Sequence, residues 1–199
     1  MHRFRSSLLG ATVLLAFSGT AAAADDWQTV QVAGDPAITI DIPAGVDQEK
    51  GVDPQKGELM AFFAENSEGD EDLACFLNRN PYSEKMDQKA WNAALASSKR
   101  SLLCETSGTD ISDYELDTSH PATSNGYSAA TCDGAYSDSS QKMKGVVVSN
   151  LTVAAPEAIY SLTCNASATD RDEAIAAWLA EWEDPVAHIQ QSLHLPGNK

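Results

Sequence analysis

The residues of this chain best suited to covalent chemistry are its four cysteines. Cys75, Cys104, Cys132 and Cys164 follow one another at spacings of 29, 28 and 32 residues. Structural zinc sites bring thiolates in close pairs such as C-x-x-C, and thiol oxidoreductases use the same short motif, so these wide spacings disfavour both. An even number of cysteines in an exported chain instead predicts two disulfide bonds.

Four cysteines allow three pairings, and spacing does not select firmly among them. We favour Cys75 with Cys104, because a strand and a returning helix would bring these two residues to the same end of the domain. Cys132 would then pair with Cys164. This second pair has a geometric difficulty: a third strand of a simple meander would hold its strands about 9 to 10 Å apart, whereas disulfides join Cα atoms about 4.4 to 6.8 Å apart.

The histidines do not form a recognisable catalytic arrangement. A serine or cysteine nucleophile needs a base, usually a histidine, and no G-x-S-x-G elbow is present. His120 precedes a proline in a stretch that resembles a polar loop, and His188 and His194 follow near the end of the last predicted helix. We therefore expect no catalytic residue, no enzymatic activity and no cofactor.

The acidic stretch 65–72 is the best candidate for metal binding. It contains five carboxylates, of which Glu65, Glu68, Asp70 and Asp72 are the candidate ligands, and oxygen ligands of this kind suit Ca²⁺. The spacing departs from the D-x-[DN]-x-[DN]-G pattern of a dedicated calcium loop. A solvated hairpin tip is the interpretation that we favour, because long polar turns belong on surfaces.

The composition and the first residues point to export. The chain has 199 residues and a formal net charge of -16, which disfavours nucleic acid as a partner. A basic start, an apolar run over 8–17 and small residues up to Ala24 predict a signal peptide over 1–24, followed by a single domain over 25–199. The run is shorter than the roughly 20 residues of a membrane span, and we expect none in the mature chain. The short, alanine-rich leader is typical of bacteria and favours the periplasm.

Periodicity then suggests the elements that position these residues. Alternating patterns predict strands, and apolar residues at intervals of three or four predict helices. The expected strands are 27–32, 37–42, 59–64, 73–78, a short one near 114–116, and a meander over 126–136, 143–154 and 158–164. One helix is expected from Ser83 or Asp87 to about Cys104, and another from Thr169 or Asp170 to about Leu195, with a kink at Pro185. The result is an α+β fold, an antiparallel sheet covered by two main helices.

Trp178 and Trp182 lie on the apolar stripe of the second helix. An exposed pair of this kind could form an aromatic ligand platform. Their place on the stripe favours a core role instead.

Several of these segments resemble the PsbP-like family, which is named for an extrinsic subunit of photosystem II and includes many small exported bacterial proteins. The resemblance lies in Ile40–Gly45, in Asn125-Gly126-Tyr127, in the strand ending at Ile159–Cys164, and in Ile189–Pro196. It implies an α/β/α sandwich around an antiparallel sheet and a binding or accessory role. It brings no active-site residue, and it does not account for the four cysteines.

Two functions follow as expectations. The first is an exported, non-catalytic interaction or accessory protein of the bacterial periplasm, with an unknown protein partner or small ligand in the envelope. The alternative is a small-ligand or Ca²⁺-binding protein that uses the acidic stretch or a cleft between sheet and helix. A pocket lined by convergent polar groups would favour ligand binding. A flat, exposed apolar patch would favour a protein partner.

Overall fold

The computed structural model describes residues 26–49, 52–66, 71–97, 115–137 and 145–197. Over these residues two hairpins are followed by a helix, a four-stranded meander and a long C-terminal helical segment. The strands are β1 (Trp27–Val32), β2 (Asp35–Pro43), β3 (Glu58–Glu65), β4 (Glu71–Pro81), β5 (Glu115–Ser124), β6 (Tyr127–Ser137), β7 (Gly145–Ala154) and β8 (Ala158–Ala168). The helices are η1 (Pro54–Lys56), α1 (Gln88–Ala96), α2 (Arg171–Ala177), the π-helical turn η3 (Trp178–Trp182) and α3 (Glu183–Ser192).

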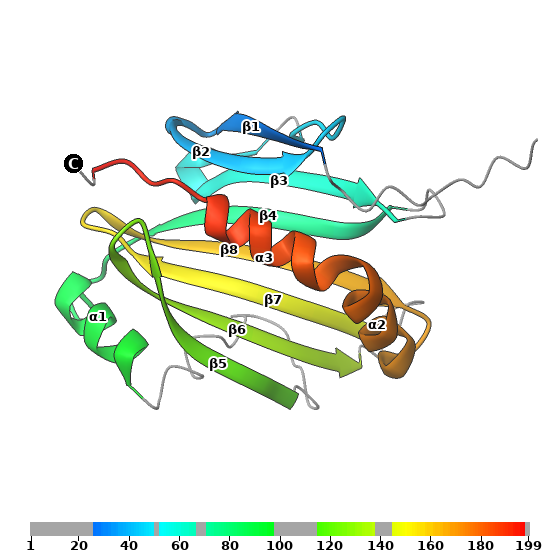
Figure 1. The fold of residues 1–199 in the computed structure, drawn as a ribbon. Coiled ribbons are helices and arrows are strands. Elements are labelled where there is room, and N and C mark those ends of the chain that lie inside the picture. The colour runs from blue at the N-terminus through cyan, green and yellow to red at the C-terminus, as the bar shows by residue number, and fades with distance from the viewer. Residues whose placement is uncertain (1–25, 50–51, 67–70, 98–114, 138–144, 198–199) are drawn as a thin grey trace, which may run out of the picture.

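Six strands form one antiparallel sheet in the order β3-β4-β8-β7-β6-β5, and β1 and β2 form a separate hairpin (Figure 1). The predicted α+β fold with antiparallel sheets is confirmed. The predicted meander is also confirmed, since Thr131 of β6 lies opposite Leu151 of β7, and Leu151 lies opposite Leu162 of β8.

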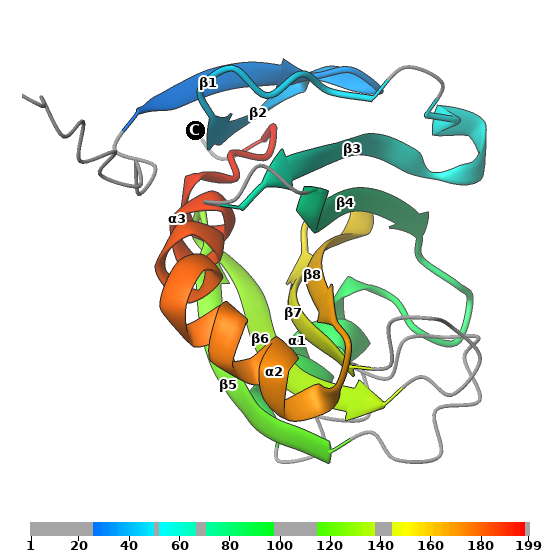
Figure 2. The same cartoon turned by 90° about the vertical axis from the view of Figure 1, so that its right-hand side faces the viewer.

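The helices lie on opposite sides of the six-stranded sheet, with α2 and α3 on one side and α1 on the other (Figure 2). Successive side chains of a strand point to opposite faces. Accordingly Val153 of β7 packs in the main core with the C-terminal helix, and its neighbour Ala154 packs with Leu95 of α1 in a second, smaller core.

Side-chain caps set the beginnings of α1 and α2. Asp87 accepts a hydrogen bond from the Ala90 amide at 2.8 Å, and Asp170 accepts one from the Glu173 amide at 2.9 Å. The prediction that the first helix continues to Cys104 was wrong, because α1 ends at Ala96. Its next residue, Ser97, is extended and donates its hydroxyl to the Ala94 carbonyl at 2.8 Å, a local bond that competes with helix continuation.

Pro185 does not break the C-terminal helical segment. A proline lacks an amide hydrogen and clashes with the carbonyl four residues earlier. Here the backbone widens just before it into the π-helical turn, in which the Glu183 amide donates to the Trp178 carbonyl five residues back. Trp178 and Trp182 keep only 7% and 6% of their surface exposed, which confirms their core role.

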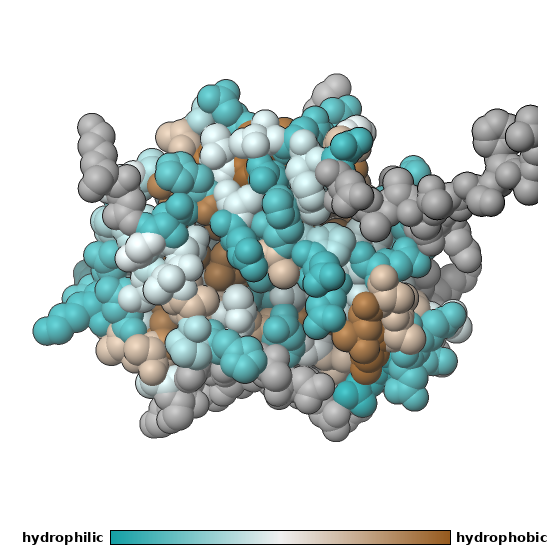
Figure 3. Space-filling view, in the orientation of Figure 1, coloured by the Kyte–Doolittle hydropathy of each residue, from teal (hydrophilic) through white to brown (hydrophobic). Residues whose placement is uncertain are grey.

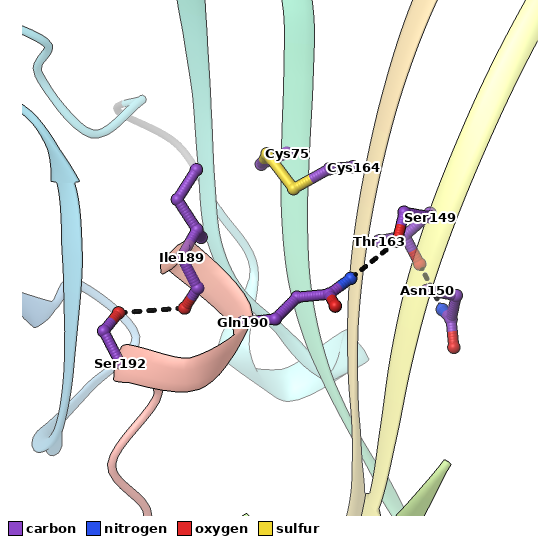
Figure 4. The surroundings of a disulfide bond; sticks show 8 residues. All are labelled: Cys75, Ser149, Asn150, Thr163, Cys164, Ile189, Gln190 and Ser192. Carbon is purple, nitrogen blue, oxygen red and sulfur yellow. Dashed lines mark hydrogen bonds between the residues drawn. A yellow bond between two sulfur atoms is a disulfide. The ribbon is translucent and has the colours of Figure 1, made fainter. Parts of the chain in front are cut away.

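The disulfide in the described part of the chain joins Cys75 of β4 to Cys164 of β8, with 4.1 Å between the Cα atoms (Figure 4). Both predicted pairings, Cys75 with Cys104 and Cys132 with Cys164, were therefore wrong. β8 returns along the chain to lie beside β4, and the register places Cys75 directly opposite Cys164. The two cysteines are 89 residues apart in the chain, so their spacing in the sequence does not predict that they lie side by side.

Cys132 and Cys164 are also kept apart by the sheet itself, because β7 lies between their strands. Cys132 lies opposite Asn150, on the face that carries α1, whereas Cys164 lies opposite Ser149, on the face of the C-terminal helix. The structure thus contains one disulfide among the residues that it describes, where two were predicted for the whole chain. Cys104 lies outside the described residues.

Replacing both Cys75 and Cys164 with alanine should lower the free energy of unfolding by about 2 to 5 kcal/mol, because the bond closes a long loop in the unfolded chain. Urea denaturation of the variant and of the wild-type protein measures this difference. Non-reducing peptide mapping of the wild-type protein should recover the Cys75 peptide joined to the Cys164 peptide. A Cys75 peptide joined to Cys104 would contradict the structure.

Candidate functional site: a cleft between sheet and helix

The C-terminal helical segment packs on β6, β7 and β8, and the sheet continues beyond this cover to the edge strand β5 (Figures 1 and 2). The space left between the helices and this side of the sheet is a cleft of about 630 Å³. It is lined by α2, the π-helical turn and α3 on one side, and by β5, β6 and β7 on the other. Clefts of about 300 to 1,000 Å³ are typical for small-molecule ligands.

The helical wall of the cleft is largely apolar. It is formed by Ile175, Trp178, Leu179, Val186 and Ala187. Leu179 is 60% exposed, and with Phe63 it is one of two large apolar side chains exposed among the described residues. Figure 3 shows a hydrophobic patch over α2 and the π-helical turn, so the apolar surface of the helical wall continues to the outside of the molecule.

The strand wall is more polar. Thr131 and Asp133 line it from β6 and Ser149 from β7, and α3 contributes Gln190. The Gln190 side-chain amide donates to the Ser149 hydroxyl at 2.9 Å, and both residues are buried (Figure 4). Buried polar groups persist where they are hydrogen-bonded, so this pair forms a stable polar floor.

One end of the cleft is closed by the hairpin between β5 and β6. Its turn is Asn125-Gly126, whose φ angles of 51° and 79° fit the left-handed backbone that a two-residue hairpin turn requires. The Asn125 amide donates to the Leu193 carbonyl, and its oxygen lies 3.1 Å from the His194 ring. Tyr127 donates its hydroxyl to the Pro196 carbonyl at 3.3 Å. The residues that follow α3 therefore hold this hairpin tip in place.

The structure does not bring the three histidines together. His188 stacks on Trp27 with 4.1 Å between ring centroids, and its Nε2 lies 3.1 Å from the Asp41 carboxylate, so it attaches the β1–β2 hairpin to α3. His194 follows α3 and pairs its backbone with Thr39 of β2. None of the three lines the cleft.

His120 was predicted in a polar loop, and that prediction was wrong. It is exposed within β5, which is longer than the sequence pattern indicated. Pro121 obscured the strand, but an edge strand tolerates a proline because one side of its backbone has no partner strand.

The acidic stretch is only partly described. Asp72 accepts a hydrogen bond from the Trp182 indole at 3.1 Å, which ties the start of β4 to the C-terminal helical segment. Glu65 is exposed at the end of β3, and Glu68 and Asp70 lie outside the described residues. Within the described ranges, no three residues of the metal-ligating types His, Cys, Asp and Glu lie close enough to hold an ion.

Two tyrosines outside the cleft have perturbed acidity. Burial raises the pKa of Tyr160 above its ordinary value. Burial, followed by the nearby Asp87 carboxylate, likewise raises the pKa of Tyr82. Both phenols are therefore neutral at physiological pH, and Tyr82 donates its hydroxyl to the Ala155 carbonyl.

The sequence predicted a sheet–helix cleft in general terms and offered Trp178 as a possible ligand platform, but it identified none of the polar residues that line the cleft. Ser149, Thr131 and Gln190 lie in ordinary strand and helix patterns, and nothing in their sequence neighbourhood marks them as cleft residues. Their convergence depends on which strands lie side by side.

The fold and the cleft define an α+β protein with a ligand-sized space between an antiparallel sheet and its C-terminal helix. No protein-family model matches the chain, and no curated protein matches its sequence. Among solved structures, cyanobacterial PsbP from Synechocystis is 12% identical, with a TM-score of 0.47 over 94% of this chain and 98% of that chain. LpqN of Mycobacterium tuberculosis, described as involved in cell envelope biogenesis, is 19% identical, with a TM-score of 0.46 over 84% of this chain and 89% of its own.

A third structure, from Bacteroides thetaiotaomicron, is 7% identical, with a TM-score of 0.49 over 85% of this chain. The chain spans about half of that protein, 48% of its length. Cyanobacterial PsbP, a member of the family that the sequence resembles, is thus among the solved structures to which this chain is similar. These similarities concern the fold alone, and nothing about activity, ligand or partner follows from them.

Replacing Asn125 with alanine should destabilise the protein by about 1 to 2 kcal/mol, because alanine adopts the left-handed backbone at positive φ less readily than asparagine, whose short polar side chain stabilises it. The substitution also removes the side-chain contacts with Leu193 and His194. Asn125→Gly is the matched variant, since it keeps the turn and loses only those contacts. Hydrogen exchange of the His194 amide should accelerate in both variants, and urea unfolding should show the larger loss in Asn125→Ala. Unchanged exchange in both would show that the hairpin tip does not hold the C-terminal residues.

Proposed function

We propose that this chain is an exported, non-catalytic binding protein of the bacterial envelope that holds a small amphipathic ligand in the cleft between the sheet and the C-terminal helical segment. One observation carries the proposal: a space of about 630 Å³ has an apolar helical wall on one side and hydrogen-bonding groups on the other. An apolar cleft with a few placed polar groups is the usual construction of a small-molecule site.

The position of the histidines supports a non-catalytic role. Histidine is the residue most often used as a general base, and none of the three histidines lines the cleft. His188 and His194 make structural contacts, and His120 is exposed on the edge strand β5. Ca²⁺ binding by the acidic stretch is less favoured, because Asp72 is already hydrogen-bonded to Trp182.

The exposed Leu179 supports a second candidate function, the accessory role itself. An apolar patch at the surface is a common feature of protein–protein contacts. The patch over α2 continues from the mouth of the cleft, so a protein partner could contact Leu179 while a ligand occupies the cleft. Replacing Leu179 with serine would then weaken the partner's binding.

Export and a second disulfide are part of the proposal. The chain would enter the periplasm through the signal peptide over 1–24, and the Cys75–Cys164 bond leaves Cys104 and Cys132 to pair with each other. No described cysteine is free. Among the described residues, no helix is both long and apolar enough to cross a membrane.

Protein recovered from the periplasm should begin at Ala24 or Asp25 and react with iodoacetamide only after reduction, because all four cysteines would be in disulfides. Intact mass spectrometry before and after reduction measures both properties. An intact Met1 would rule out cleavage of the leader. A reactive thiol in the unreduced protein would rule out the second disulfide.

The cleft can be tested with the uncharged fluorescent probe N-phenyl-1-naphthylamine. Its fluorescence should rise on binding to the wild-type mature protein, since the probe would leave water for the apolar helical wall. Ala187 lines the cleft, so Ala187→Phe should fill the space and reduce the affinity about tenfold or more, the effect of losing roughly 1.4 kcal/mol.

Ala176→Phe is the matched control, because Ala176 is exposed on α2 and does not line the cleft. It should bind the probe as the wild-type protein does. Circular dichroism and the melting temperature confirm that both variants fold. Equal binding by both variants, or no binding by the wild-type protein, would contradict a ligand site in this cleft.

A further inference from the structure

We infer that the ligand of this cleft is a cationic amphiphile, a small molecule with an apolar body and one amine or quaternary ammonium group that lies beside Glu183. The inference rests on the proposed function and adds the charge of the ligand to it.

The charged side chains that line the cleft are all acidic among the described residues. Among the described residues that line the cleft there is no lysine, arginine or histidine, whereas Asp133 and Glu183 are carboxylates. An anionic group entering this space would lose hydration without gaining a cationic side chain, which is costly. A cationic group would instead find the opposite charge.

Glu183 lies on the helical wall of the cleft. It is the first residue of α3 and lines the cleft together with Leu179 and Val186, which lie about one turn before and after it. Its side chain is exposed, and its carboxylate makes no hydrogen bond or ion pair within the described part of the chain. Asp133 already takes part in an interaction within the chain, so we assign the ligand's positive group to Glu183.

The charge of Glu183 contributes less to affinity than the apolar wall does. An exposed carboxylate paired with an ammonium group contributes at most about 1 kcal/mol, a factor of roughly five in affinity. The apolar wall, on which Ile175, Leu179 and Ala187 keep accessible surface, must therefore supply most of the binding free energy. Charge then selects among ligands of similar apolar size. The net charge of -16 acts in the same direction, since it raises the local concentration of cations.

The test uses three single-chain probes with the same decyl tail: decyltrimethylammonium, decyl maltoside and decyl sulfate. Isothermal titration calorimetry, with each probe below its critical micelle concentration, should give the order cationic, neutral, anionic from tightest to weakest. Added salt should weaken decyltrimethylammonium binding and leave decyl maltoside binding nearly unchanged.

Glu183→Gln should weaken decyltrimethylammonium binding about two- to fivefold and leave decyl maltoside binding unchanged. Asp184→Asn is the matched control, because Asp184 is also exposed, is adjacent in the chain and does not line the cleft. Both substitutions change the net charge equally, so the long-range field cancels in the comparison. Asp184→Asn should therefore bind decyltrimethylammonium almost as the wild-type protein does.

The outcomes separate this inference from the proposed function. If decyl sulfate binds as tightly as decyltrimethylammonium, or if Glu183→Gln behaves like Asp184→Asn, the cationic ligand is wrong and the ligand site stands. The same holds if N-phenyl-1-naphthylamine enters the cleft while decyltrimethylammonium does not bind. If neither the naphthylamine nor any decyl probe binds the wild-type protein, the proposed function fails together with the inference.

Discussion

The structure depends on one apolar contact, between the stripe of the C-terminal helical segment and the inner face of the six-stranded sheet. An antiparallel sheet with one apolar face must cover that face, and each large side chain buried in doing so contributes about 1.5 to 3 kcal/mol. The helical segment covers the middle of the sheet with residues that are almost fully buried: Trp178, Trp182, Val186, Ile189 and Leu193. It is narrower than the sheet. The cleft is the part of the inner face that one helical layer leaves uncovered, so the packing that holds the fold together also defines the candidate site.

The residues that follow α3 connect three parts of this arrangement. The amide and carbonyl of His194 pair with the carbonyl and amide of Thr39 at 2.8 and 3.1 Å, which joins the β1–β2 hairpin to the end of the helix. The Leu193 carbonyl accepts from Asn125, and the Pro196 carbonyl accepts from Tyr127, at the tip of the β5–β6 hairpin. The closed end of the cleft therefore rests on a few backbone groups near the end of the chain. A structural change in the β5–β6 hairpin, in α3 or in β2 would therefore disturb the other two elements through these contacts.

The two walls of the candidate site differ in their chemistry. In the proposed ligand site, apolar side chains of the helical wall would supply affinity without direction, and hydrogen-bonding groups of the strand wall would orient the ligand. The polar pair Gln190 and Ser149 lies on the same face of the sheet as the Cys75–Cys164 bond, which joins β4 to β8 beneath α3 (Figure 4). The central strands under the helix are thus linked covalently, whereas the outer strands β5 and β6, which border the cleft, are held by hydrogen bonds and packing.

By itself, the sequence determined the features that depend on neighbours a few residues away. The alternation over 27–32 and 37–42, the meander and the helical stripe through Trp178 and Trp182 identified the elements, their buried faces and the α+β class. Tertiary structure decided which elements are neighbours. The periodicity of apolar residues predicts the face to which a side chain points, but it does not predict which strand lies beside another. Residue spacing therefore could not predict three features: the pairing of Cys75 with Cys164, the Asp72–Trp182 hydrogen bond and the lining of the cleft. Each of these joins residues that are distant in the chain, and they meet only because β8 returns beside β4 and the helical segment then folds back over the sheet.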